Sequence, residues 1–255
     1  FGWALRLCDF PQGIFVMALQ SATLPSLSLL VARGEHAEVA KTFAYGMRLA
    51  LFVAIAASVL LVVLAEPIVV VIFQRGQFDA ESARETAKAL MAQGVGIWTV
   101  AAVRQLVGVY YALGDTRTPV VVAALDLAVF VLLALALKGS LGRVGVSLAV
   151  SGASAAQMCL LWFGLRKKLG DTRLREIAIS ALRTLAACVP AAAAGLVLVH
   201  YTADFGRGNA VARLVPGIAA GAAFGLTFLA AARLFRSEEL AALTSGISRR
   251  RRSKA

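Results

Sequence analysis

The sequence predicts an all-α polytopic membrane protein, a bundle of about seven transmembrane helices. Its 255 residues are 60% hydrophobic and only 16% charged, which is more apolar surface than a soluble domain of this size needs. Apolar stretches of roughly 20 or more residues, the length that a helix needs to cross the hydrocarbon core, recur along the chain. The sequence lacks the short alternating strands of a membrane barrel, so helices must supply the backbone hydrogen bonds.

Seven apolar segments are expected to span the membrane. They comprise residues 3–31, 43–73, 82–113, 118–138, 142–166, 176–200 and 211–235. In the second segment, Glu66-Pro67 predicts a kink or break, because proline cannot donate the helical hydrogen bond. In the third, Gly94 and Gly96 permit close contact with another helix.

Turn residues and small residues predict how the later segments pack. The run from Gly114 to Pro119 predicts a tight turn between two antiparallel spans. Small residues in the fifth segment favour close helix packing, with substrate contact as the alternative; they are Gly145, Ser147, Ser151, Gly152 and Ser154. A doubled Gly-x-x-x-Gly pattern in the seventh segment predicts that it pairs with the sixth. Its glycines are Gly217, Gly221 and Gly225.

Basic residues predict the orientation of the chain. The loops after the first, third, fifth and seventh segments are richer in Lys and Arg than the opposite loops, which places them in the cytoplasm. The C-terminus is then cytoplasmic, and its basic run 248–255 can bind anionic lipid. The net charge of +12 does not predict nucleic-acid binding, because the basic residues lie between apolar segments and not on one face.

Charged residues inside apolar segments are the candidate functional residues, since each costs about 2.5–3.5 kcal/mol to insert. Arg6 and Asp9 share one helical face, and an ion pair near a helix end is the alternative to a functional role. Arg104 and Asp126 lie at similar depth on adjacent antiparallel spans. They predict an interhelical ion pair or a shared polar pocket, unless helix rotation turns them to different neighbours. Arg48, nearer a span end, is expected to extend to the interface.

Enzymatic chemistry finds little support in the sequence. Cys8, Cys159 and Cys188 fall in apolar segments without paired spacing and are interpreted as packing residues. The two histidines are far apart, the chain has no phosphate-binding loop motif, and no loop carries a cluster of carboxylates. We therefore expect no enzyme activity, no metal ion and no cofactor.

Three ordered motifs carry a resemblance to a known family. They are Arg6-Leu-x-x-Phe-Pro-x-Gly-x-Phe, Pro67-Ile-x-x-x-Ile-Phe-x-Arg-Gly-x-Phe and Tyr110-Tyr-Ala-Leu-Gly-Asp-Thr-Arg-Thr-Pro. With this spacing the chain resembles the second lobe of MurJ/MviN proteins, the lipid II flippases of bacterial peptidoglycan synthesis. The resemblance covers about residues 1–168, and the last two segments agree only by hydropathy.

The resemblance implies an organisation and a location. Residues 1–168 would form the five-helix second lobe of a two-lobe flippase, residues 169–240 two extra helices, and residues 241–255 a basic cytoplasmic tail. The chain would be a fragment whose N-terminal lobe is missing, in the bacterial inner membrane, with lipid II and membrane lipids as partners. In the family the two extra helices border a groove that can hold a lipid tail.

The resemblance also implies roles for the charged residues. Arg6 matches an arginine that lines the family's central cavity, where a guanidinium suits the pyrophosphate of the substrate. Asp9 matches a position that is often acidic, and Arg104 matches one that is usually basic. The positions of a sodium site found in some members hold Phe130 and Ala134, whose side chains cannot bind a hard cation. Two alternatives stay open: an exporter of another lipid-linked oligosaccharide or a drug, and a membrane scaffold that transports nothing.

Overall fold

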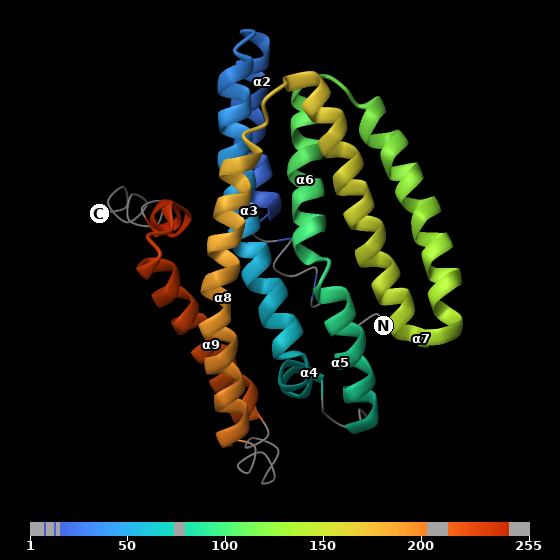
Figure 1. Cartoon of the computed structure of the whole chain (residues 1–255), viewed down its shortest axis with the longest axis vertical. Coiled ribbons are helices and arrows are strands. Elements are labelled where there is room, and N and C mark those ends of the chain that lie inside the picture. The colour runs from blue at the N-terminus through green and yellow to red at the C-terminus, as the bar shows by residue number, and fades with distance from the viewer. Residues whose placement is uncertain (1–7, 9–12, 14–15, 74–79, 203–213, 245–255) are drawn as a thin grey trace.

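In the computed structural model, the described residues are 8, 13, 16–73, 80–202 and 214–244, and among them the only regular elements are helices (Figure 1). The helices are α2 (Met17–Ala32), α3 (His36–Val63), α4 (Ala65–Phe73), α5 (Ala80–Gly94), α6 (Ile97–Ala112), α7 (Arg117–Leu169), α8 (Leu174–Thr202) and α9 (Val215–Leu234). A further short helix covers residues 238–244. The all-α prediction is confirmed.

Most of the predicted spans have a counterpart. Five helical segments are long and apolar enough to cross a membrane: α3, two arms of α7 that cover Arg117–Gly142 and Val144–Leu169, α8 and α9. Helices α5 and α6 together make a sixth candidate span, bent by 43°. The first predicted segment, 3–31, lies partly outside the described residues, and its described part includes the 16-residue apolar helix α2.

The second predicted segment is broken close to the expected position. Helix α3 ends at Val63 and α4 begins at Ala65, so Pro67 lies in the first turn of α4, where a missing N–H is tolerated. Figure 1 shows α4 almost end-on, turned across the direction of α3. The predicted break at Glu66-Pro67 is thus confirmed to within a few residues.

Two serines from neighbouring helices bind the backbone where the third span is broken. Ser58 of α3 donates a hydrogen bond to the Gly94 carbonyl oxygen at 2.5 Å, and Ser151 of α7 donates to that of Ala92 at 2.9 Å. A Cβ atom on Gly96 would lie 2.8 Å from the Cα of Ser151, so only glycine fits there. The close contact predicted for these glycines is confirmed, and hydroxyl donors replace part of the lost helical bonding.

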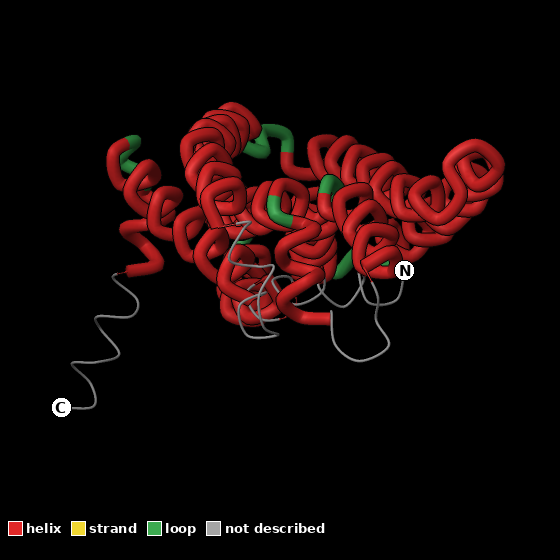
Figure 2. Tube along the Cα trace, turned by 90° about the horizontal axis from the view of Figure 1, so that it is seen from below, coloured by secondary structure: helices red, strands yellow, loops and turns green. Residues whose placement is uncertain are grey.

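Helix α7 is a hairpin whose second arm lies inside the bundle. The arms meet at Gly142, where φ is +55°. The second arm contacts α6, since Tyr110 donates a hydrogen bond to the Leu161 carbonyl oxygen at 2.9 Å. It contacts the first arm at Gly152, whose Cβ would lie 3.0 Å from Leu133. Both views show the first arm as the outermost helix, with the second arm between it and α6 (Figures 1 and 2).

Helices α8 and α9 pack along one another, as predicted, but not through the expected glycines. A Cβ on Gly217 would meet α4, at 2.7 Å from the Pro67 carbonyl oxygen, and Gly221 and Gly225 have open space beside them. The prediction that the glycine pattern makes the α8–α9 contact is therefore wrong. Instead, Gly195 of α8 lies against Ala220, where its Cβ would be 3.5 Å from the Ala220 carbonyl oxygen.

Candidate functional site

Two of the four predicted site residues, Arg6 and Asp9, lie outside the described residues. The other two lie on α6 and on the first arm of α7. Helix α6 is covered on three sides. Gln105 lies against a glycine of α3, Gly108 lies against Gln20 of α2, and Tyr110 is bonded to Leu161 of α7.

Arg104 lies on the fourth, least covered face of α6. At about 100° per residue, this face carries positions 100, 104, 107 and 111. None of the four side chains is buried, and Tyr111 is 48% exposed. The face is turned away from α3, between the sides that contact α2 and the second arm of α7. The Nη1 atom of Arg104 is itself shielded and has no hydrogen-bond partner among the described residues.

Asp126 lies on a different surface. It shares a face of the first arm of α7 with Val122 and Leu133, and this face packs on the second arm at Gly152. Its Oδ1 atom is shielded and lacks a hydrogen-bond partner among the described residues. Apart from this face, other helices hardly cover the first arm. Only 6% of its most apolar 18-residue stretch is buried within the bundle.

The predicted ion pair between Arg104 and Asp126 does not form. The ion pairs of the described residues, with N–O distances up to 4.0 Å, do not include one between these two side chains. The physical reason is that the second arm of α7 lies between α6 and the first arm. Helix α6 and the first arm of α7, although consecutive in the chain, are therefore not packed side by side, and Arg104 and Asp126 face different neighbours.

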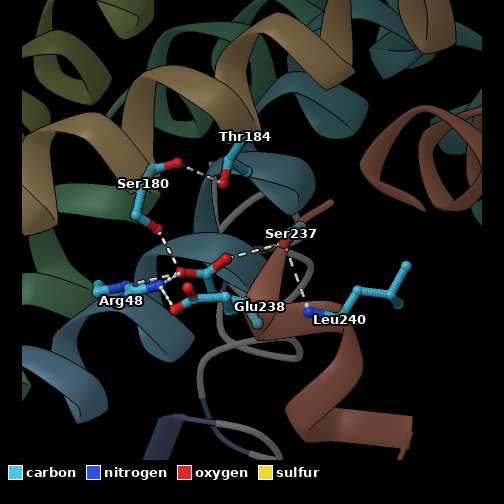
Figure 3. A network of polar contacts seen from close by, with 7 residues as sticks. Arg48, Ser180, Thr184, Ser237, Glu238 and Leu240 are labelled. Atoms are coloured by element: carbon cyan, nitrogen blue, oxygen red, sulfur yellow. Dashed lines mark hydrogen bonds and ion pairs between the residues drawn. The ribbon is translucent and has the colours of Figure 1, made fainter. Parts of the chain in front are cut away.

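Arg48 bonds two carboxylates, and sequence reasoning missed both partners. Its Nε donates to Oε1 of Glu239 at 2.7 Å, and its Nη2 donates to Oε2 of Glu238 at 2.7 Å (Figure 3). Ser180 of α8 and Ser237 also donate to Glu239, at 2.7 and 2.8 Å. The expectation that Arg48 extends to the interface did not include its partners, two carboxylates that follow α9. We call these five residues the clasp.

Within the clasp, Glu239 carries the most contacts. Its side chain is 7% exposed, against 74% for Glu238. Burial alone would raise the pKa of Glu239, but the hydrogen bonds from Ser180, Ser237 and Arg48 outweigh it and hold the pKa below its usual value. The available sequence signal was a pair of acidic residues directly after an apolar span.

A second polar contact closes the turn between α6 and α7. Lys168, at the end of the second arm, lies 2.7 Å from Oδ2 of Asp115. Thr118 donates to the same carboxylate from its hydroxyl at 2.6 Å and from its backbone N–H at 2.9 Å. The turn itself uses Gly114 at φ +72°. The tight turn predicted from Gly114 to Pro119 is thus confirmed, and it fixes the first arm to the second.

Two neighbouring apolar cavities lie where α8 faces α3 and α6. The larger, of about 490 Å³, is lined mainly by α3 and α8, and the smaller, of about 280 Å³, reaches the second arm of α7. Leu51, Trp98 and Ala181 line both. Among the described residues, no group of three or more His, Cys, Asp or Glu side chains is arranged to hold a metal ion.

The fold and the composition define the chain as a polytopic α-helical membrane protein. The sequence profile of the family described as lipid II flippase MurJ matches residues 2–216. The chain therefore belongs to the lipid II flippase MurJ family.

Individual relatives agree with this assignment. The chain is 36% identical over 167 residues to a probable lipid II flippase MurJ of Bdellovibrio bacteriovorus, a match that covers 65% of this chain and 32% of the relative. It is 30% identical over 166 residues to a lipid II flippase MurJ of Burkholderia cenocepacia, covering 65% and 32%. The matched part is thus about one third of each relative.

A solved structure shows the same fold. The structure described as lipid II flippase MurJ in an inward closed conformation superposes with a TM-score of 0.70 at 22% identity. The superposition covers 91% of this chain and 46% of that one.

Proposed function

We propose that this chain forms the second lobe of a lipid II flippase of the bacterial inner membrane, and that it acts together with an N-terminal lobe. Membership of the family supports this proposal, as do relatives named for lipid II flipping that are about three times as long as the matched segment. Two lobes that rock about a central site would carry the polar head across the hydrocarbon.

The observation that carries the proposal is the position of Arg104. A guanidinium on the least covered face of a helix, away from the core of its own lobe, is where a cavity between two lobes would need a cation. Lipid II has a pyrophosphate, and guanidinium groups bind phosphate oxygens through paired hydrogen bonds. In this proposal Arg6 and Arg104 bind the pyrophosphate and Asp9 orients Arg6, whereas Asp126, which faces the second arm of α7, takes no part in the site of Arg104.

The apolar cavities beside α8 fit the other part of such a substrate. Their walls are mostly aliphatic and aromatic side chains, and they lie between the lobe and α8, the first of its two additional helices. A polyprenyl chain needs such a surface while the head crosses. The division into residues 1–168, 169–240 and a basic tail at 241–255 follows this arrangement, with the turns at Gly34, Gly114 and Gly170 in the cytoplasm.

The test is complementation of a bacterium whose own lipid II flippase is depleted, with the complete protein that contains this chain. Arg104→Gln should reduce the flipping rate about tenfold or more, because one charge-assisted contact of ~1.5–3 kcal/mol is lost. Arg104→Lys keeps the charge but loses the planar guanidinium that makes paired hydrogen bonds. Its flipping rate should therefore lie between that of Arg104→Gln and that of the unsubstituted protein.

A matched control removes a surface arginine. Arg84 is 67% exposed and lies 3.9 Å from Glu66, so Arg84→Gln should leave growth unchanged. Normal growth and normal lipid II accessibility with Arg104→Gln, at equal protein level, would refute the assignment of Arg104. Failure of the unsubstituted protein to complement would refute the proposed function itself.

A further inference from the structure

Helices α3 and α8 run side by side and pack along much of their length, and two specific contacts lie towards the ends of this pair. At one end the clasp joins Arg48 of α3 to Ser180 of α8 through Glu239. Towards the other end Gly195 of α8 lies against Leu64, which directly follows α3, since a Cβ on Gly195 would be 3.3 Å from the Leu64 side chain. The larger apolar cavity lies between these two contacts, so the contacts contribute, with the rest of the α3–α8 packing, to the distance between its walls.

The clasp lies at one limit of the larger cavity and beside the smaller one. Leu51, which lines both cavities, is one turn from Arg48 on the same face of α3, and Ala181 follows Ser180 in α8. Glu239 bonds both helices through the same Oε1 atom, which accepts from Arg48 Nε and from Ser180 Oγ, each at 2.7 Å. One carboxylate oxygen from beyond α9 therefore bridges the two walls.

The residues that flank the α8–α9 pair in the sequence have an unusual backbone conformation. Arg173, just before α8, has φ +53°, and Arg236, just after α9, has φ +51°. Among the described residues these are the two non-glycine residues with positive φ. Such conformations are strained for residues other than glycine and persist only where surrounding contacts stabilise them. Arg236 is followed directly by three clasp residues, Ser237, Glu238 and Glu239. Their contacts are therefore placed to stabilise its backbone conformation.

We propose that Arg48 and Glu239 are positioning residues that keep α8 close to α3, and that loss of their contact lets α8 swing away about the Leu64–Gly195 contact and widens the cavity. The clasp thus regulates access from the bilayer to the apolar cavity. The position of α8 does not depend on the proposed function. The proposed function supplies only the ligand that would enter the cavity, a polyprenyl tail.

The test measures two distances in the complete protein in liposomes, by pulsed electron resonance between spin labels. The three cysteines are replaced by alanine. One label pair, at the exposed positions Tyr45 and Leu182, reports the clasp end, and the other, at Ile72 and Val197, reports the opposite end. Arg48→Ala and Glu239→Gln should each lengthen or broaden the clasp-end distance by about 2 Å or more, and leave the other distance unchanged.

Two controls separate the clasp from general loosening. Glu238→Gln removes a carboxylate that is 74% exposed and, among the described residues, is bonded to Arg48 alone, so it should change the clasp-end distance little. Glu38→Gln removes an exposed ion pair with Lys41 on the same helix and should leave both label distances unchanged. The reversed pair, Arg48→Glu with Glu239→Arg, should restore the distance in part.

Three results would overturn the proposal. These are an unchanged clasp-end distance in both Arg48→Ala and Glu239→Gln, equal changes at the two ends, or an effect of Glu38→Gln as large as that of Glu239→Gln. If Arg48→Ala does not fold, Arg48→Lys provides the same comparison, because lysine keeps the charge but cannot bond both carboxylates through a planar fork. A loss of flipping with unchanged distances would refute this proposal without touching the proposed function.

Discussion

Tyr110 of α6 and Gly164 of α7 touch so closely that a single added methyl group on the glycine would overlap the tyrosine hydroxyl. The same hydroxyl donates a hydrogen bond to the Leu161 carbonyl oxygen at 2.9 Å, and the ring is fully buried. This contact brings the second arm of α7 against α6, and so it keeps the first arm at the outside of the bundle.

Gly164→Ala is expected to destabilise the protein by about 1–3 kcal/mol through overpacking. Tyr110→Phe alone should cost about 1 kcal/mol for the lost hydrogen bond. Because the phenylalanine removes the overlapping oxygen, the double variant should be more stable than the sum of the single effects predicts. Thermal unfolding in detergent measures all three, and strict additivity would contradict the close contact.

Asp115 should make stability depend on pH in acid. Its bonds from Lys168, then from the hydroxyl and the backbone N–H of Thr118, hold the pKa of Asp115 well below its usual range. Because the folded-state pKa is lowered, the stabilisation is complete above the unfolded value near pH ~4 and is lost as the pH falls through the folded-state pKa.

The measurement compares Asp115→Asn with the unsubstituted protein by thermal unfolding at pH 7 and in steps down to pH 3. The variant should be less stable at pH 7, and the difference in unfolding temperature between the two proteins, the gap, should narrow as the pH falls below about 4. Glu38→Gln, which breaks an exposed pair with Lys41, is the matched control and should show little gap at either pH. A gap that stays constant across this range would rule out the ionised carboxylate as the cause.

Glycines of the same type should differ sharply when each is changed to alanine. At Gly96 the new Cβ would lie 2.8 Å from the Cα of Ser151, and since backbone cannot easily move, we expect a loss of about 1–3 kcal/mol. At Gly221 the Cβ would meet nothing within 4 Å, so alanine should be neutral or stabilise the helix by up to ~1 kcal/mol. Equal unfolding temperatures for the two variants would contradict the packing at the broken span.

Arg104 and Asp126 are expected to act independently. They make no ion pair, and the second arm of α7 separates the helices that carry them. In a double-mutant cycle of Arg104→Gln and Asp126→Asn, the effects on unfolding should add to within about 0.5 kcal/mol. A double variant more stable than either single one would instead indicate a paired charge.

Hydropathy and turn residues predicted most of the helices of this fold. The break before Pro67, the turn at Gly114 and the close contact at Gly96 each depend on one residue type with a strong local preference, so they can be inferred from sequence. Hydropathy does not predict which helices lie side by side. The misplaced ion pair of Arg104 and Asp126 came from assuming that spans joined by a short turn must pack together.

The clasp could not be predicted for a related reason. Arg48 and Glu239 are 191 residues apart, and each has an ordinary local explanation: an arginine near a span end, and a polar residue just after the last span. Only the packing of α8 and α9 on α3 brings them together. The charged residues of the candidate site were found because burial of a charge in an apolar segment is costly wherever its neighbours lie.

The first arm of α7 also relates the protein to the thickness of its bilayer. Between Arg117 and Lys138 it has 20 residues without a basic side chain. At ~1.5 Å per residue they span ~30 Å, the thickness of a typical hydrocarbon core, so the arm fits with little tilt. Since this arm is covered on one face only, a thinner bilayer would force it to lean before any other helix does. Lipid chain length would then act on the protein first through its outermost helix.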